Sequence, residues 1–143
     1  MTSRAFVVPT DVVDAILAQA EAQRPSECCG LLVGRTDVVV AAVAMRNAST
    51  TPASTYELDS REHIDLRRTL RKFLPPLEIV GVYHSHPDGP ARPSVTDVAE
   101  AHYPGWLHVI VGWGGGGAEV RGFLLSRENV TPVELVPVSA GGG

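Results

Sequence analysis

Apolar residues recur with helical spacing in two stretches of the chain. Residues 11–23 predict an amphipathic helix by this spacing. A second helix is predicted from residue 60 to about residue 73, and a short third helix near residues 95–102, with Ser94 as its cap. The candidate inward positions of the second helix are Ile64, Leu66, Leu70 and Phe73. Three helices are therefore expected.

Shorter apolar or β-branched runs lie between these helices and predict strands. The expected strands cover residues 4–8, 28–34, 36–47, 54–59, 77–86, 106–113, 118–126 and 131–138. Helices and strands alternate early in the chain and strands dominate later. This order favours an α/β fold, a mixed β-sheet with helices packed on its faces. We expect one domain over residues 1–138 and a disordered glycine-rich tail over residues 139–143.

Composition and charge narrow the class of protein. The chain has 143 residues, of which 44% are hydrophobic and 20% charged, with a net charge of −4. This balance excludes a disordered chain, and the negative charge gives no general attraction to nucleic acid or to an anionic membrane. No apolar run is long enough to span a bilayer, and the first residues lack the apolar core of a secretion signal. Cys28 and Cys29 are adjacent and suit a reducing compartment, so we expect a cytoplasmic protein.

The candidate chemistry lies in residues 80–97, where an apolar strand ends in two histidines, His84 and His86. Side chains two positions apart on a strand point to the same face, so both imidazoles can face one point. Asp97 follows on the first turn of the short helix, and the loop before it can bring the carboxylate beside the histidines. Two imidazoles and one carboxylate are a ligand set of catalytic zinc, which keeps its fourth position for water. The sequence therefore predicts a zinc site here.

Glu27 and Ser94 are candidate catalytic residues beside this metal site. Hydrolysis of an amide also needs a base and a later proton donor, and a carboxylate that does not bind the metal commonly serves as both. Glu27 lies just before the buried strand 28–34, where its side chain can reach the end of a neighbouring strand. Ser94 has two open roles, because its hydroxyl can cap the helix or donate a hydrogen bond to the oxyanion. His108 and Glu100 are the next candidates for the base.

In order and spacing, these residues resemble the JAMM (MPN+) metalloprotease family. The chain has a glutamate at 27, His-x-His-Pro at 84–87 and Ser-x-x-Asp at 94–97. The resemblance runs from the first helix to strand 106–113. It implies a zinc hydrolase of peptide or isopeptide bonds, on a fold similar to that of cytidine deaminases. At the matching positions it implies zinc ligation by His84, His86 and Asp97, acid/base catalysis by Glu27, and oxyanion stabilisation by Ser94.

The compact chain is similar to the small bacterial members of this family, because the eukaryotic deubiquitinating members carry insertions and added domains. By analogy, the substrate would be the Gly-Gly tail of a small ubiquitin-like or sulfur-carrier protein, from which cysteine is released or tail residues are trimmed. Two alternatives stay open, a non-catalytic interaction module and a hydrolase of another small amide. Glu27 argues against the first, since a scaffold needs no base. The sequence does not predict an oligomeric state.

The remaining histidines and basic residues receive plainer interpretations. We expect His63 and His102 to be solvated, and His108 to be a histidine with satisfied hydrogen bonds in the core or at a strand edge. Arg67, Arg68, Arg71 and Lys72 form a basic cluster on the second helix. This cluster is expected to be a solvated face, with docking of an acidic carrier as the alternative.

Overall fold

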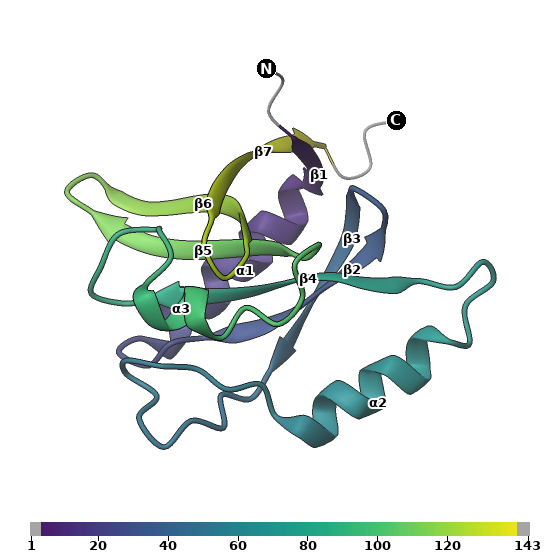
Figure 1. The fold of residues 1–143 in the computed structure, drawn as a ribbon, viewed down its shortest axis with the longest axis horizontal. Coiled ribbons are helices and arrows are strands. Elements are labelled where there is room, and N and C mark those ends of the chain that lie inside the picture. The colour runs from purple at the N-terminus through teal and green to yellow at the C-terminus, as the bar shows by residue number, and fades with distance from the viewer. Residues whose placement is uncertain (1–3, 140–143) are drawn as a thin grey trace.

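The computed structural model describes residues 4–139, which form seven strands and three helices (Figure 1). In chain order these are β1 (Ala5–Pro9), α1 (Thr10–Gln23), β2 (Cys29–Arg35), β3 (Val38–Met45), α2 (Ser60–Leu70), β4 (Glu78–His86), α3 (Val95–Ala99), β5 (Leu107–Gly114), β6 (Gly117–Leu125) and β7 (Val130–Val138). The first predicted helix is present in full, the second and third each end three residues before the predicted end, and seven of the eight predicted strands are present. Residues 140–143, most of the expected tail, lie outside the described residues.

The sheet is mixed, as predicted, but it closes into a barrel in the order β1-β3-β2-β4-β5-β6-β7. β4 and β5 are parallel, while β2 runs antiparallel to both of its neighbours, β3 and β4. The ring closes because β1 pairs in parallel with β7, from Ala5 opposite Glu134 to Pro9 opposite Val138. The sequence interpretation of a sheet with two faces missed this closure, since nothing local in either strand indicates its distant partner.

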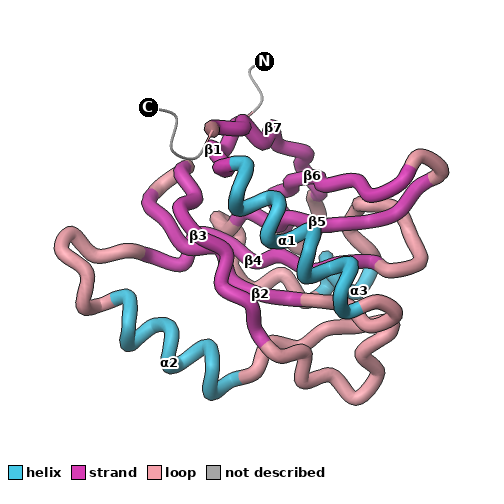
Figure 2. The backbone as a smooth tube through the Cα atoms, turned by 180° about the vertical axis from the view of Figure 1, so that it is seen from behind, coloured by secondary structure: helices cyan, strands magenta, loops and turns pink. Residues whose placement is uncertain are grey.

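Helix α1 contributes the helical part of the main hydrophobic core. Its buried side chains are Val12, Ile16 and Ala20, which are spaced to lie on one face. They pack in a cluster with strand residues such as Phe6, Leu32 and Val109. Figure 2 shows α1 lying across the strands of the barrel. The apolar residues whose spacing predicted this helix therefore form the surface that packs against the sheet.

Helix α2 lies apart from the barrel and contacts β4 (Figure 1). Leu70 is buried and Leu66 is half-buried, as expected. The prediction was wrong for Ile64, which is 52% exposed because only a narrow line of the helix meets the body. It was also wrong for Phe73, which is 47% exposed in the turn after the helix ends at Leu70. The predicted strand at 54–59 was also wrong, because the segment is a loop with one isolated bridge between Asn47 and Leu58. No helix in the part of the chain described is long and apolar enough to cross a membrane.

Strand pairing brings the ends of β2 and β4 together. Cys29 lies opposite His84 in the antiparallel pair, so the residues just before β2 run beside the end of β4. The loop after β4 is held by β5, where Trp113 N–H donates to the Gly89 carbonyl at 2.8 Å. A Cβ at Gly112 would meet the backbone of this loop, so the close approach requires glycine there. The loop and the two strand ends therefore lie together at one corner of the barrel.

Candidate metal centre

Three side-chain atoms converge at this corner. Nε2 of His84 lies 3.0 Å from Nε2 of His86, and Oδ2 of Asp97 lies 3.2 and 3.1 Å from these nitrogens. Metal bonds of 2.0–2.1 Å at tetrahedral angles would set such atoms about 3.3 Å apart. Two imidazole nitrogens and a carboxylate oxygen are also the donor types that zinc accepts. The donor set and its spacing therefore fit a zinc ion bound by these residues.

Neighbouring contacts orient the three side chains. Nδ1 of His86 lies 3.1 Å from the carbonyl oxygen of Pro90, which turns its Nε2 toward the cluster. The backbone N–H of Ser94 donates to Oδ2 of Asp97 at 2.8 Å. Burial would raise the pKa of Asp97, but its contacts with the two histidines hold that pKa well below the usual range. The carboxylate is thus ionised and fixed in direction.

Glu27 lies against the same cluster and is only 5% exposed. It offers a carboxylate oxygen within 4.8 Å of ligand atoms of both His84 and His86, so these three residues could also hold a metal ion. Burial raises the pKa of Glu27 to about 7, with a smaller opposing effect from His86 and a further increase from Asp97. Asp97 lies within 3.2 Å of both histidine nitrogens. We therefore keep Asp97 as the candidate ligand and Glu27 as the candidate base.

The structure places Ser94 as the cap of α3. Its Oγ accepts a hydrogen bond from the Asp97 N–H at 3.1 Å, and the Asp97 side chain accepts from the Ser94 N–H, a capping box. The helix-capping role is therefore present. Because Oγ accepts in this bond, its own proton stays available for donation to another oxygen. The oxyanion role stays a prediction.

Sequence reasoning missed three residues that build this corner. The Tyr56 ring stacks on the His84 ring at 4.4 Å between centroids. The buried Ser85 hydroxyl accepts from the Cys28 N–H at 2.8 Å and so ties the segment after Glu27 to β4. Asn47 donates to the Glu27 carbonyl at 3.0 Å. For Ser85, its position between the two histidines was a usable signal, whereas Tyr56 and Asn47 meet the site only through the tertiary fold.

The interpretation of His108 as a histidine with satisfied hydrogen bonds was wrong. The residue is buried, at 6% exposed, but neither ring nitrogen has a hydrogen-bond partner among residues 4–139. The residue lies on β5, and its side chain lines a cavity. Burial, and then the nearby His84, lower the pKa of His108 to about 4, so the ring is neutral at pH 7.

Comparison with known proteins gives the family. Residues 9–126 match the family described as prokaryotic homologs of the JAB domain. A desampylase from Haloferax volcanii is 34% identical over 77% of this chain and 82% of its own length. A CysO-cysteine peptidase from Mycobacterium tuberculosis is 35% identical over 74% of this chain and 72% of its own length. A probable TtuB-protein conjugate cleaving protease from Thermus thermophilus is 32% identical over 82% of this chain and 74% of its own length.

Solved structures share the fold. A protein from Desulfitobacterium hafniense, 27% identical, superposes with a TM-score of 0.82 and covers 95% of this chain and 94% of its own. A JAB1/MPN domain protein from Archaeoglobus fulgidus, 22% identical, has a TM-score of 0.58 and covers 96% of this chain and 99% of its own. A structure described as a JAMM metalloprotease-like zinc site, 23% identical, has a TM-score of 0.55 with the same coverage. The chain therefore belongs to the JAMM family, as a small prokaryotic member of its metallopeptidases.

Proposed function

We propose that this enzyme is a zinc peptidase that hydrolyses an amide bond at the Gly-Gly tail of a small ubiquitin-like or sulfur-carrier protein. One observation carries the chemistry, namely that His84, His86 and Asp97 converge within about 3 Å of one another beside a buried Glu27. The choice of substrate is supported by the relatives, which are a desampylase, a CysO-cysteine peptidase and a TtuB-conjugate protease. The enzyme would act in the cytoplasm, where the buried thiols of Cys28 and Cys29 stay reduced.

Glu27 supplies the proton transfers in this proposal. Zinc held by His84, His86 and Asp97 would polarise the attacking water and the scissile carbonyl. Near neutral pH, Glu27 is partly ionised because its pKa is about 7, so its carboxylate can take a proton from the water. The same carboxyl then holds the proton for delivery to the leaving amine. A pKa close to the working pH suits a group that must act first as base and then as acid.

Ser94 would stabilise the negative oxygen that forms as the amide carbonyl is attacked. Its Oγ is fixed in place by the bond from the Asp97 N–H, and its proton is free to donate. Donors positioned in advance stabilise developing charge without reorganising. The capping role and the oxyanion role are therefore compatible in one hydroxyl.

The outer face of α2 supports an acidic protein partner. Ile64 is exposed at its centre. Three of the four positions three or four residues away along the helix are arginines, the fourth being Ser60, and a further arginine caps the end of the helix. These neighbours are Arg61, Arg67, Arg68 and Arg71, all exposed. Among residues 4–139, none of them forms an ion pair with a carboxylate. An apolar spot ringed by cations fits a carrier whose surface presents an apolar side chain among acidic ones.

Metal analysis tests the proposal directly. The purified protein should carry about one zinc per chain, and His84→Ala and Asp97→Ala should each lose it, because each removes one of three donors. His108→Ala is the matched control on the neighbouring strand and should keep the zinc. Protein that binds no zinc on titration would contradict the proposal.

Substrate tests decide between the proposal and a hydrolase of another small amide. The zinc-loaded enzyme should cleave a carrier protein that ends in Gly-Gly plus one further residue, and mass spectrometry should show loss of that residue alone. Activity on simple amides together with none on such carriers would favour the other hydrolase. A protein that binds zinc and a carrier but cleaves neither kind of substrate would be the interaction module.

A further inference from the structure

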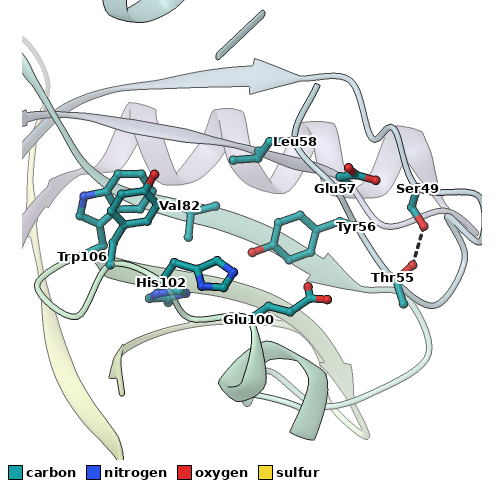
Figure 3. Close-up of a pocket in the computed structure, with 11 residues that line it drawn as sticks. Ser49, Thr55, Tyr56, Glu57, Leu58, Val82, Glu100, His102 and Trp106 are labelled. Atoms are coloured by element: carbon teal, nitrogen blue, oxygen red, sulfur yellow. Dashed lines mark hydrogen bonds between the residues drawn. The ribbon is translucent and has the colours of Figure 1, made fainter. Parts of the chain in front are cut away.

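A cavity of about 430 Å³ lies next to the candidate metal centre (Figure 3). We call it the aromatic pocket, because its walls include Tyr56 and Trp106, with Tyr103 stacked on Trp106 at 3.9 Å between ring centroids. Figure 3 shows Tyr56 in the middle, between Trp106 at one end and Glu57 at the other. Tyr56 also stacks on His84, so one ring separates the pocket from the candidate zinc ligands. A group in this pocket would lie beside the reacting bond.

The pocket contains a buried polar side chain that lacks a partner. His108 lines the pocket, and neither Nδ1 nor Nε2 has a hydrogen-bond partner among the described residues. Leaving such a buried group unpaired is unfavourable, so a partner is expected. A neutral imidazole has one nitrogen that accepts a hydrogen bond. A ligand with an N–H donor would satisfy it.

The charged residues that line the pocket favour a ligand with a positive charge. Two carboxylates, Glu57 and Glu100, line its wall, and of the described lining residues none is lysine or arginine. The charged side chains at this wall are therefore acidic. Aromatic faces attract cations as well, through the negative potential of the ring.

We propose that the aromatic pocket binds the cationic end of a substrate side chain, an alkylammonium or a guanidinium group, against His108 and the aromatic rings. Its place beside the scissile bond rests on the function proposed above, whereas the binding itself does not. The cation has two possible sources, a basic residue in the carrier tail just before Gly-Gly or a basic residue on the leaving side. Both offer the same chemistry to the pocket.

A binding experiment without turnover tests the pocket. Trp113→Phe leaves Trp106 as the one tryptophan, so its fluorescence reports on the pocket. The probes are Nα-acetyl-lysine methylamide and its norleucine counterpart, which has nearly the same chain without the charge. The lysine probe should change the fluorescence of Trp106 with at least tenfold tighter binding than the norleucine probe, and high salt should reduce the difference. Equal binding of the two probes would overturn the proposal.

Variants assign the contact to named side chains. His108→Leu keeps an apolar group of similar size and should remove most of the preference for lysine. Glu100 lies at the exposed rim, so Glu100→Gln should not disturb folding. This variant should weaken the preference for lysine severalfold. His63→Gln on α2 is the matched control and should change nothing. In the parent protein, the ring ¹⁵N resonances of His108 should shift with the lysine probe, and unchanged resonances would overturn the assignment to His108.

Hydrolysis then identifies the source of the cation and separates this inference from the proposed function. One pair of peptides carries lysine or norleucine immediately before Gly-Gly, and a second pair carries them after the scissile bond. The pair in which lysine lowers KM gives the side that enters the pocket. Cleavage with no lysine preference in either pair would refute the pocket inference and leave the peptidase intact. Lysine binding without any cleavage would refute the peptidase and leave the pocket inference intact.

Discussion

Glu27 is a carboxyl group held where water hardly reaches it. Its pKa in the folded protein is about 7, against 4.5 for an ordinary glutamate. Because the pKa is raised, the folded state favours the protonated carboxyl. The free energy of unfolding therefore decreases as the pH rises from about 4.5 to about 7. The difference between the two pKa values corresponds to a loss of free energy of unfolding on the order of 3 kcal/mol above pH 7. A buried carboxyl that opposes folding at neutral pH is typical of a residue kept for chemistry.

Glu27→Gln should therefore separate activity from stability. The variant should bind zinc yet lose at least about 10² in kcat, because an amide cannot accept the proton. Metal-free, at pH 8, it should unfold at higher denaturant than the parent, whereas at pH 4 the two should be equal, since Gln resembles the protonated acid. The exposed Glu128→Gln serves as the control. Turnover within about threefold of the parent would show that another group is the base.

Substitution of Ser94 should separate its helix-capping role from its catalytic role. Ser94→Ala should keep zinc, because the backbone N–H that contacts Asp97 remains, and should lose about 1 kcal/mol of stability with the cap. If the hydroxyl also donates to the oxyanion, kcat should fall by on the order of 10² to 10³. Ser94→Thr, which keeps the hydroxyl, should restore much of both. A loss of stability alone would leave Ser94 with only its capping role.

The residues that carry the metal chemistry could be predicted from the sequence, and those that support them could not. Residue type and spacing predicted the candidate ligands His84, His86 and Asp97, and the structure brings these side chains together. Tyr56 was placed in a strand that does not form. His108 was taken as satisfied because neighbouring apolar residues indicate burial, but burial does not say whether a partner is present. Such contacts arise only from the packing of segments far apart in the chain.

At the scale of elements, the loop after β4 decides how well the histidines are held. It packs on β5 so closely that a methyl group at Gly112 would meet the backbone of Gly89, Pro90 and Ala91. The Pro90 carbonyl is also the atom that contacts Nδ1 of His86. A strand of the barrel therefore sets the direction of a candidate ligand through a loop.

Gly112→Ala should disturb that direction without touching a ligand. Because backbone cannot move aside cheaply, the loop should shift, with a loss of about 1–3 kcal/mol of stability. Zinc affinity should fall by about 10- to 100-fold, as when a partner behind a metal ligand is lost. Gly115→Ala, in open space on the same hairpin, is the control and should leave both unchanged. Unchanged zinc affinity in Gly112→Ala would show that the loop does not orient His86.

Helix prediction succeeded where one face meets a large core and failed where it does not. In α1, the periodic apolar residues are the ones that are buried. For the second helix, the same pattern suggested four inward positions. However, α2 contacts the body along one narrow line, which leaves Ile64 exposed, and it ends at Leu70, before Phe73. The apolar period of a helix cannot show how much of it the rest of the chain will cover.

At the scale of the whole molecule, charge is divided unevenly. The chain carries a net charge of −4, yet the outer face of α2 presents four arginines around Ile64. If an acidic carrier docks there, Arg68→Glu with Arg71→Glu should raise KM for the carrier protein by roughly tenfold or more, with a smaller effect at high salt. KM for a short tail peptide should not change. Arg127→Glu, an exposed charge in the loop between β6 and β7, is the control, and an equal effect from it would contradict docking on α2.

The pairing of β1 with β7 also bears on how the protein is made. On one side β1 pairs in parallel with β3, but its partner on the other side is β7, residues 130–138, whereas the candidate metal centre is complete in the chain by Asp97. On the ribosome, β1 must therefore wait, with one border unpaired, until nearly the whole protein has emerged. An unpaired strand is prone to join another chain, so the interval between synthesis of the site and closure of the barrel is when this enzyme is most exposed to misassembly.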